Sequence, residues 1–175
     1  HDVRIESVAG KLTDHYNPAN KTVNLSPEVY GGRSVSAAAV AAHEVGHAVQ
    51  HATGSKWLEM SSQLVPVAQL SGKIMNIVLW SMILGMSILK IFEMNTVIWV
   101  LIAAQAVITV VSVVTLPVEY DASNRALIWL TTSGTVTTSE HDKAKDALTW
   151  AARTYLVAAL ASLTQLAYYF SLLRD

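Results

Sequence analysis

The sequence predicts a mainly α-helical, integral membrane protein with a small β-hairpin and about three transmembrane helices. Hydrophobic residues make up 52% of the 175 residues and charged residues only 14%, whereas soluble domains carry about 25% charged residues. The few charges leave long uncharged runs, which are typical of membrane spans. A separate alanine-rich stretch, residues 37–52, predicts a further helix, because alanine is the strongest helix former.

Residues 1–36 are mixed and polar, and we expect a β-hairpin within them. A turn signal at residues 17–20 separates two short runs, residues 12–16 and 21–25. An edge strand of such a hairpin can bind an extended peptide by strand addition. The hairpin can equally be a structural ribbon that covers the next helix, and the sequence leaves both interpretations open.

Residues 37–52 contain the pattern His43-Glu44-Val45-Gly46-His47. Residues four apart lie on one face of a helix, so His43 and His47 can bind one metal ion, and zinc suits two imidazoles best. Glu44 follows the first histidine and can accept a proton from a metal-activated water. Two histidines on an apolar helix can also be core residues or a structural metal site. Ser34 or Ser36 is expected to cap the start of this helix.

His51 lies four residues beyond His47, but helix geometry argues against it as a third metal ligand. Its distance from His43 along the helix axis is about 12 Å, too far for both to bind one ion. We therefore expect a surface or packing role for His51. The chain has no cysteine, so any metal ligands must come from His, Asp or Glu.

Three uncharged runs predict the membrane spans. Residues 74–89 and residues 94–118 are uncharged over 16 and 25 residues, and they form a predicted transmembrane hairpin at 74–118. Residues 148–173 form the third predicted span, with 20 uncharged residues at its end. Pro117 marks the expected end of the second span. A buried helical pair in a soluble domain is the alternative, and these lengths disfavour it.

Glu119 directly follows the second predicted span. Because a hairpin returns the chain to the side that it left, Glu119 is expected on the same side as the helix at 37–52, close to the bilayer surface. Glu119 is therefore the candidate for the third metal ligand. Residues 119–130 are predicted to form the helix that carries it. Asp121 remains a competing ligand at the same place.

The basic residues are distributed unevenly about these spans. If the three spans are correct, only Lys90 and Arg174 lie on the side opposite the metal-binding helix, and the other ten Lys and Arg residues share its side. The positive-inside rule then places the metal side in the cytoplasm. The net charge of −1 gives no indication of a nucleic-acid partner.

Four motifs, L-T-D-H-Y-N-P, V-N-L-S-P-E-V-Y, S-V-S-A-A-A-V-A-A-H-E-V-G-H-A-V-Q-H and P-V-E-Y-D-A-S-N-R-A-L, resemble those of the bacterial YugP-type neutral zinc metallopeptidases. The resemblance covers nearly the whole chain. It implies a zinc endopeptidase of the gluzincin kind in the bacterial cell membrane, distantly similar to HtpX and the CAAX-prenyl endopeptidases. It also implies a further N-terminal membrane helix before residue 1. The expected single domain has four parts: a zincin-like part at 1–72, the hairpin at 74–118, the third-ligand helix at 119–130 and the last span at 148–173.

The resemblance also assigns roles to individual residues. His43, His47 and Glu119 match the ligands of one zinc ion per chain, and Glu44 matches the general base. An aspartate commonly follows the glutamate ligand by four residues in HtpX-like proteins and orients a histidine, but this chain has Ser123 there. Whether Asp121 or Ser123 supplies that hydrogen bond stays open.

The resulting hypothesis is hydrolysis of peptides or membrane proteins near a lipid bilayer, with Glu44 as the base. His15, Tyr16, His51 and Tyr120 are candidate donors to the oxyanion, and the sequence does not choose among them. A non-catalytic, metal-stabilised membrane scaffold or partner-binding protein is the main alternative, and the presence of Glu44 disfavours it. A helical transporter is a weaker alternative. Cobalt or manganese can occupy the same ligand set as zinc, and nothing in the sequence indicates an oligomeric state.

Overall fold

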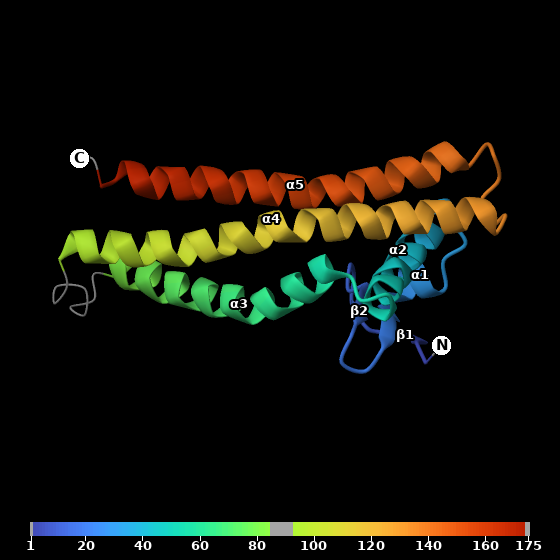
Figure 1. Ribbon diagram of the computed structural model, residues 1–175, viewed down its shortest axis with the longest axis horizontal. Helices are drawn as coiled ribbons and strands as arrows, with labels where there is room; N and C mark the ends of the chain where they lie inside the picture. The colour runs from blue at the N-terminus through green and yellow to red at the C-terminus, as the bar shows by residue number, and fades with distance from the viewer. Residues whose placement is uncertain (1, 85–92, 174–175) are drawn as a thin grey trace. The chain divides into compact units, whose positions relative to one another are not determined.

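The computed structural model of the protein describes residues 2–84 and 93–173. The described residues are mainly helical and contain one small sheet, as predicted (Figure 1). In chain order, the elements are β1 (Arg4–Ser7), β2 (His15–Asn17), β3 (Thr22–Leu25), α1 (Pro27–Tyr30), α2 (Val35–Ala52), α3 (Lys56–Ile83), α4 (Met94–Thr132) and α5 (His141–Ser171).

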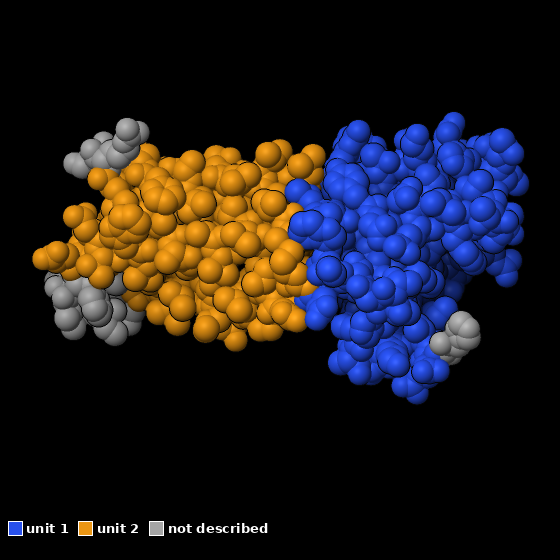
Figure 2. Space-filling view, in the orientation of Figure 1, with its two compact units in different colours: residues 1–59, 116–154 blue, residues 60–115, 155–175 orange. Residues whose placement is uncertain are grey.

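The chain divides into two compact units, which Figure 2 colours separately. The first unit comprises residues 1–59 and 116–154, and the second comprises residues 60–115 and 155–175. The sheet, α1 and α2 belong to the first unit, together with the C-terminal part of α4 and the N-terminal part of α5. All of the candidate metal ligands therefore lie in the first unit.

The three strands form one sheet in the order β1-β3-β2. β2 and β3 are antiparallel, with His15 opposite Asn24, which confirms the predicted hairpin. β1 pairs with β3 in parallel and was not predicted, because a parallel partner is joined by a long connection that leaves no local turn signal. β3 is the central strand, and its Val23 and Leu25 pack with Ala48 of α2.

Helix α2 confirms the predicted helix at 37–52. It begins after Ser34, whose hydroxyl accepts a hydrogen bond from the backbone N–H of Ala37 at 3.1 Å, as expected of an N-cap. It ends at Ala52, and Gly54 follows in the left-handed region with φ +66°. One face of α2 packs on the sheet, and another contributes Ala39 and Ala42 to a core shared with α4 and α5.

That core holds the helices of the first unit together. Ala126 and Leu130 of α4 pack with Ala144 and Leu148 of α5 and with the alanines of α2. Leu130 is fully buried. Small residues on α2 allow α2 and α4 to approach closely, which matters for the position of Glu119.

Pro117 marks the expected end of the second span, and it does not end a helix. It lies inside α4, which continues without interruption from Met94 to Thr132. A proline within a helix removes one backbone hydrogen bond, and α4 continues through it without that bond. The predicted third-ligand helix at 119–130 is therefore the C-terminal part of α4.

The three predicted transmembrane helices are not confirmed. Among the described residues, only α4 is long and apolar enough to cross a membrane by length and composition. The predicted span at 148–173 is helical in α5, but its threonine, glutamine and tyrosine residues lower its hydropathy. The predicted span at 74–89 lies partly in α3, and its residues 85–89 are outside the described residues.

The second unit has its own small core, formed around Ile98, Leu101 and Tyr169. A buried glutamine, Gln105 of α4, donates a hydrogen bond at 3.0 Å to the backbone carbonyl of Ser162 in α5. Buried polar groups of this kind join apolar helices, because an amide without a partner is costly in an apolar interior.

Candidate metal centre

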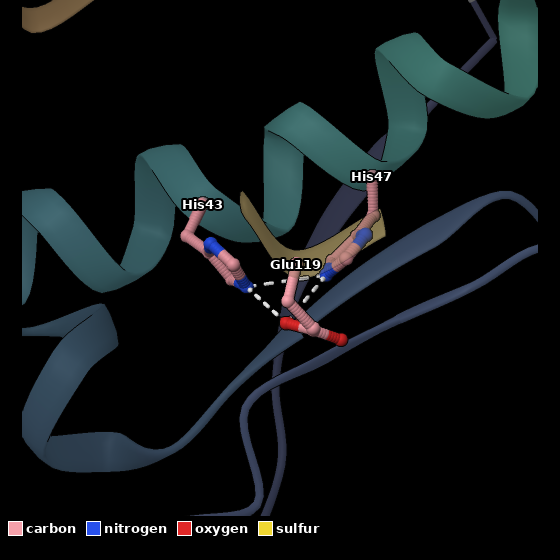
Figure 3. Close-up of side chains that lie close together, drawn as sticks. All are labelled: His43, His47 and Glu119. Carbon is pink, nitrogen blue, oxygen red and sulfur yellow. Dashed lines mark hydrogen bonds and ion pairs between the residues drawn. The ribbon is translucent and has the colours of Figure 1, made fainter. Parts of the chain in front are cut away.

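Three side chains from two helices converge in the first unit (Figure 3). The Nε2 atoms of His43 and His47 on α2 are 3.1 Å apart. The Oε2 atom of Glu119 on α4 lies 3.1 Å from the Nε2 atom of His43 and 3.7 Å from that of His47. All three side chains are largely shielded from solvent. Helix α2 therefore supplies both histidines, and α4 supplies the carboxylate.

The spacing of these atoms fits a tetrahedral zinc ion. Zinc binds His nitrogen and carboxylate oxygen at about 2.0–2.1 Å, which places two ligand atoms of a tetrahedron about 3.3–3.4 Å apart. The three observed separations, 3.1, 3.1 and 3.7 Å, bracket that value. Two imidazole nitrogens and a carboxylate also form a donor set that zinc prefers. The residues present therefore fit the metal that the sequence implied.

A glycine allows α4 to come this close to α2. A Cβ atom placed on Gly46 would lie 2.7 Å from the backbone oxygen of Ala122 and 3.2 Å from its Cα atom. Ala122 is fully buried and lies three residues after Glu119 on α4. The missing side chain at Gly46 thus lets Glu119 reach both histidines.

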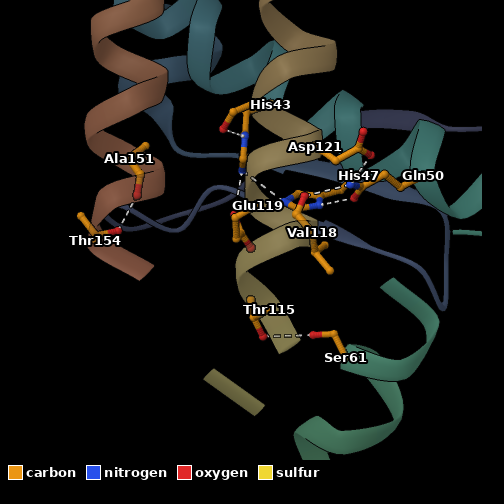
Figure 4. A network of polar contacts seen from close by, with 11 residues as sticks. His43, His47, Gln50, Ser61, Thr115, Val118, Glu119, Asp121, Ala151 and Thr154 are labelled. Atoms are coloured by element: carbon orange, nitrogen blue, oxygen red, sulfur yellow. Dashed lines mark hydrogen bonds and ion pairs between the residues drawn. The ribbon is translucent and has the colours of Figure 1, made fainter. Parts of the chain in front are cut away.

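Each histidine is also held through its other ring nitrogen. The Nδ1 atom of His43 lies 3.2 Å from the hydroxyl of Ser123, and the Nδ1 atom of His47 lies 3.0 Å from the amide oxygen of Gln50. Asp121 touches neither histidine directly, but its carboxylate accepts a hydrogen bond from Gln50 at 2.8 Å (Figure 4). Hydrogen bonds of this kind orient metal-binding histidines. Of the two residues between which the sequence left the choice open, Ser123 contacts one histidine, and Asp121 reaches the other through Gln50.

Asp121 is not placed as a competing ligand. Among the described residues, the group that could hold a metal ion consists of His43, His47 and Glu119. The carboxylate of Asp121 is instead paired with Arg125, whose Nε atom is 2.7 Å away.

The electrostatics of the site follow from burial and from the close charges. Burial raises the pKa of the Glu44 carboxyl, and the adjacent histidines and a backbone hydrogen bond from Tyr16 offset this only in part. Burial opposes a charge on Glu119, but its hydrogen bonds from His43 and His47 prevail and lower its pKa to about 2. Burial likewise opposes a charge on His47, but Glu119 prevails and raises the pKa of that imidazole. The site is therefore built to attract a cation beside an ionised Glu119.

The remaining candidate residues lie outside this group. The hydroxyl of Tyr16 is 2.8 Å from the Nδ1 atom of His51, so these two side chains form a pair at the end of α2. His15 is turned toward the backbone oxygen of Thr13, at 2.7 Å. Tyr120 lies next to Glu119 on α4 and is about half exposed.

The sequence interpretation missed two residues that shape the site, Gln50 and Gly46. Gln50 lies three residues after His47, a spacing that places two helical side chains on the same face, so its contact with His47 could have been anticipated. Gly46 lies within the metal-binding pattern itself, but only the position of Ala122 in the structure shows that this glycine allows α4 to approach α2 closely.

Comparisons with known proteins identify the family of this chain. A family model described as "Putative neutral zinc metallopeptidase" matches residues 1–174. The chain is similar to "Putative membrane protease YugP" of Bacillus subtilis (strain 168), with 39% identity over 167 residues, which cover 95% of this chain and 71% of that protein. No solved structure matches the chain. The family implies a zinc ion, and the group of two histidines and one glutamate is able to hold it. The chain belongs to the neutral zinc metallopeptidase family.

Proposed function

We propose that this chain is a membrane-bound, zinc-dependent endopeptidase in which Glu44 is the general base. The observation that carries the proposal is the convergence of His43, His47 and Glu119 beside a buried glutamate with a raised pKa. When bound, zinc supplies a Lewis acid that acidifies a water molecule and polarises the substrate carbonyl. Three protein ligands leave a fourth position for the reaction, whereas structural zinc sites are closed by four.

Glu44 moves the protons of the proposed reaction. Its carboxylate accepts a proton from the water whose oxygen attacks the carbonyl carbon, and then gives that proton to the amine nitrogen as the C–N bond breaks. A raised pKa helps with both steps, because an acid–base group is most effective when its pKa is near the working pH. A structural metal site has no use for this buried carboxylate, which is why we favour an enzyme over a scaffold.

The sheet offers a place for an extended substrate. β2 is one of the two edge strands of the sheet, and the backbone N–H of Tyr16 in that strand donates a hydrogen bond to Glu44. One side of β2 therefore lies against the site, while β3 occupies the other side. We propose that a peptide binds along this edge by strand addition, which holds its backbone beside Glu44.

The membrane part of the proposal rests on α4. Residues 94–118 of this helix are uncharged, and Glu119 follows at once. If this run spans a bilayer, Glu119 emerges directly at its end, so substrates near the membrane surface are the ones in reach. The similarity to a protein named a membrane protease supports this part. If all three predicted spans cross the bilayer, ten of the twelve Lys and Arg residues lie on the side of the site, and we therefore propose that this side is cytoplasmic.

The decisive test compares wild-type protein with Glu44→Gln in hydrolysis of an unfolded protein substrate, after purification in detergent and at matched zinc content. The glutamine has the same shape but cannot accept the proton, so we expect a rate loss of about 10²- to 10⁴-fold. The matched control is Glu28→Gln, because Glu28 is an exposed residue of α1 that pairs with Lys11.

Three outcomes are informative. Loss of activity in Glu44→Gln alone supports the proposed mechanism. Activity that persists in Glu44→Gln excludes Glu44 as the base. Wild-type protein that binds zinc tightly but cleaves nothing favours the scaffold.

A further inference from the structure

Gln50 is a fully buried residue of α2 whose amide makes three contacts. Its oxygen lies 3.0 Å from the Nδ1 atom of His47. Its nitrogen lies 2.8 Å from the backbone oxygen of Val118 and 2.8 Å from the carboxylate of Asp121 (Figure 4). The two amide hydrogens and the amide oxygen therefore each have one partner, so the side chain has a single satisfied orientation.

These contacts determine where His47 carries its proton. A backbone carbonyl can only accept, so the atom of Gln50 that faces Val118 must be the NH₂ group, and the amide oxygen must face His47. That oxygen also only accepts, so the Nδ1 atom of His47 must carry a hydrogen. The neutral imidazole then presents the lone pair of Nε2, the atom that faces His43 and Glu119.

The orientation is anchored on α4, the helix that also supplies Glu119. Val118 is the residue before Glu119, and Asp121 is fixed in turn by Arg125 at 2.7 Å. Gln50 thus ties the second histidine of α2 to the backbone of α4 next to the carboxylate ligand. A change in this contact would alter both the proton position on His47 and its distance from Glu119.

We propose that Gln50 is a positioning residue of the metal centre, which holds His47 with its proton on Nδ1 so that Nε2 is free to bind the ion. This inference rests on the proposed metal site and not on the hydrolytic step. It adds a residue that acts through His47 and does not touch the reacting atoms. Removing such a support typically weakens metal binding by about 10- to 100-fold.

The test measures the zinc dissociation constant by competition with a chelator, for detergent-purified wild-type protein, Gln50→Met and Gln105→Met. Methionine keeps the length of the side chain but has neither the amide donor nor the amide acceptor. Gln105→Met is the matched control, because Gln105 is also a buried glutamine that donates to a backbone carbonyl of a neighbouring helix. We expect about 10- to 100-fold weaker zinc binding in Gln50→Met and wild-type affinity in Gln105→Met.

The outcomes separate this inference from the proposed function. If wild-type protein binds one zinc ion and Gln50→Met binds it equally tightly, Gln50 is not a positioning residue, although the metal site stands. Equal weakening in both variants also overturns the inference, because the effect is then one of general stability. If wild-type protein binds no zinc, the metal site fails, and the inference fails with it.

A measurement on the wild-type protein keeps the inference testable even if Gln50→Met does not fold. In ¹H–¹⁵N spectra of zinc-loaded protein, we expect a slowly exchanging proton on Nδ1 of His47, because that group is buried and hydrogen-bonded. A proton found on Nε2 of His47, or an Nδ1 proton that exchanges as fast as that of a free imidazole, would overturn the proposed orientation.

Discussion

Replacing Gly46 with alanine tests whether the close approach of α2 and α4 sets the geometry of the metal site. The new Cβ atom would lie 2.7 Å from the backbone oxygen of Ala122, 3.2 Å from its Cα atom and 3.3 Å from its carbonyl carbon. These are backbone atoms, so no flexible side chain can move aside. The two helices must separate or slide, and Glu119 lies only three residues from Ala122 on the same helix.

The size of this movement can be compared with what a zinc site tolerates. Ordinary contact begins at 3.4 Å, so the 2.7 Å contact must open by about 0.7 Å, whereas metal–ligand distances are held within about 0.2 Å. We therefore expect at least about tenfold weaker zinc binding. Alanine stabilises a helix by about 1 kcal/mol relative to glycine, but overpacking costs about 1–3 kcal/mol. The expected net change in the free energy of unfolding is a loss of about 0–2 kcal/mol.

The assay combines the thermal midpoint in detergent with the zinc dissociation constant from chelator competition. Gly72→Ala is the matched control, because Gly72 also lies within a long helix, α3, and a Cβ atom there would meet nothing within 4 Å. This control should become more stable and keep wild-type zinc affinity. If Gly46→Ala behaves like Gly72→Ala in both measurements, the reasoning from the Gly46–Ala122 contact is refuted.

Two further predictions concern the histidines. Ser123→Ala removes the hydroxyl that lies 3.2 Å from the Nδ1 atom of His43. Chelator competition should then show about tenfold weaker zinc binding. An unchanged zinc affinity would mean that this contact does not orient His43. The raised pKa of His47 means that protons compete with zinc to a pH above the usual imidazole value of about 6.5. Zinc affinity measured against pH should therefore rise until the pH passes that raised pKa and then level off. Glu119, with a pKa of about 2, stays ionised throughout this range. A zinc affinity that is constant between about pH 6 and 8 would contradict this prediction.

The parts of the structure that the sequence predicts best are those that depend on neighbours in the chain. The helix that holds His43 and His47 is predictable from its alanines and its serine cap, and the four-residue spacing places both imidazoles on one face. The β2–β3 hairpin is predictable from its turn residues. Pro117 shows the limit of such local rules, because α4 continues through it although proline removes a backbone hydrogen bond.

The parts that the sequence did not predict depend on contacts between distant segments. Nothing near Arg4 indicates its parallel pairing with Thr22, and nothing near Gln50 indicates that the carbonyl of Val118 will accept its hydrogen bond. Glu119 was anticipated as a ligand because a returning hairpin would bring it back to the helix at 37–52. The structure brings it there by the packing of α4 on α2, and three spans are not needed for that result.

The metal centre joins two segments that are 76 residues apart in the chain, and α4 contributes more than its one ligand. Val118 supplies the carbonyl that accepts a hydrogen bond from Gln50, and Glu119 supplies the carboxylate ligand. Asp121 is the second partner of the Gln50 amide nitrogen. The backbone of Ala122 lies against Gly46, and the hydroxyl of Ser123 lies beside His43. All of these groups move together if α4 shifts against α2. Metal binding and the packing of these two helices are therefore thermodynamically coupled, because an ion that binds only the packed arrangement stabilises that arrangement, and does so more strongly the tighter it binds. Gly46, Gln50 and Ser123 should thus affect zinc affinity although none of them touches the ion.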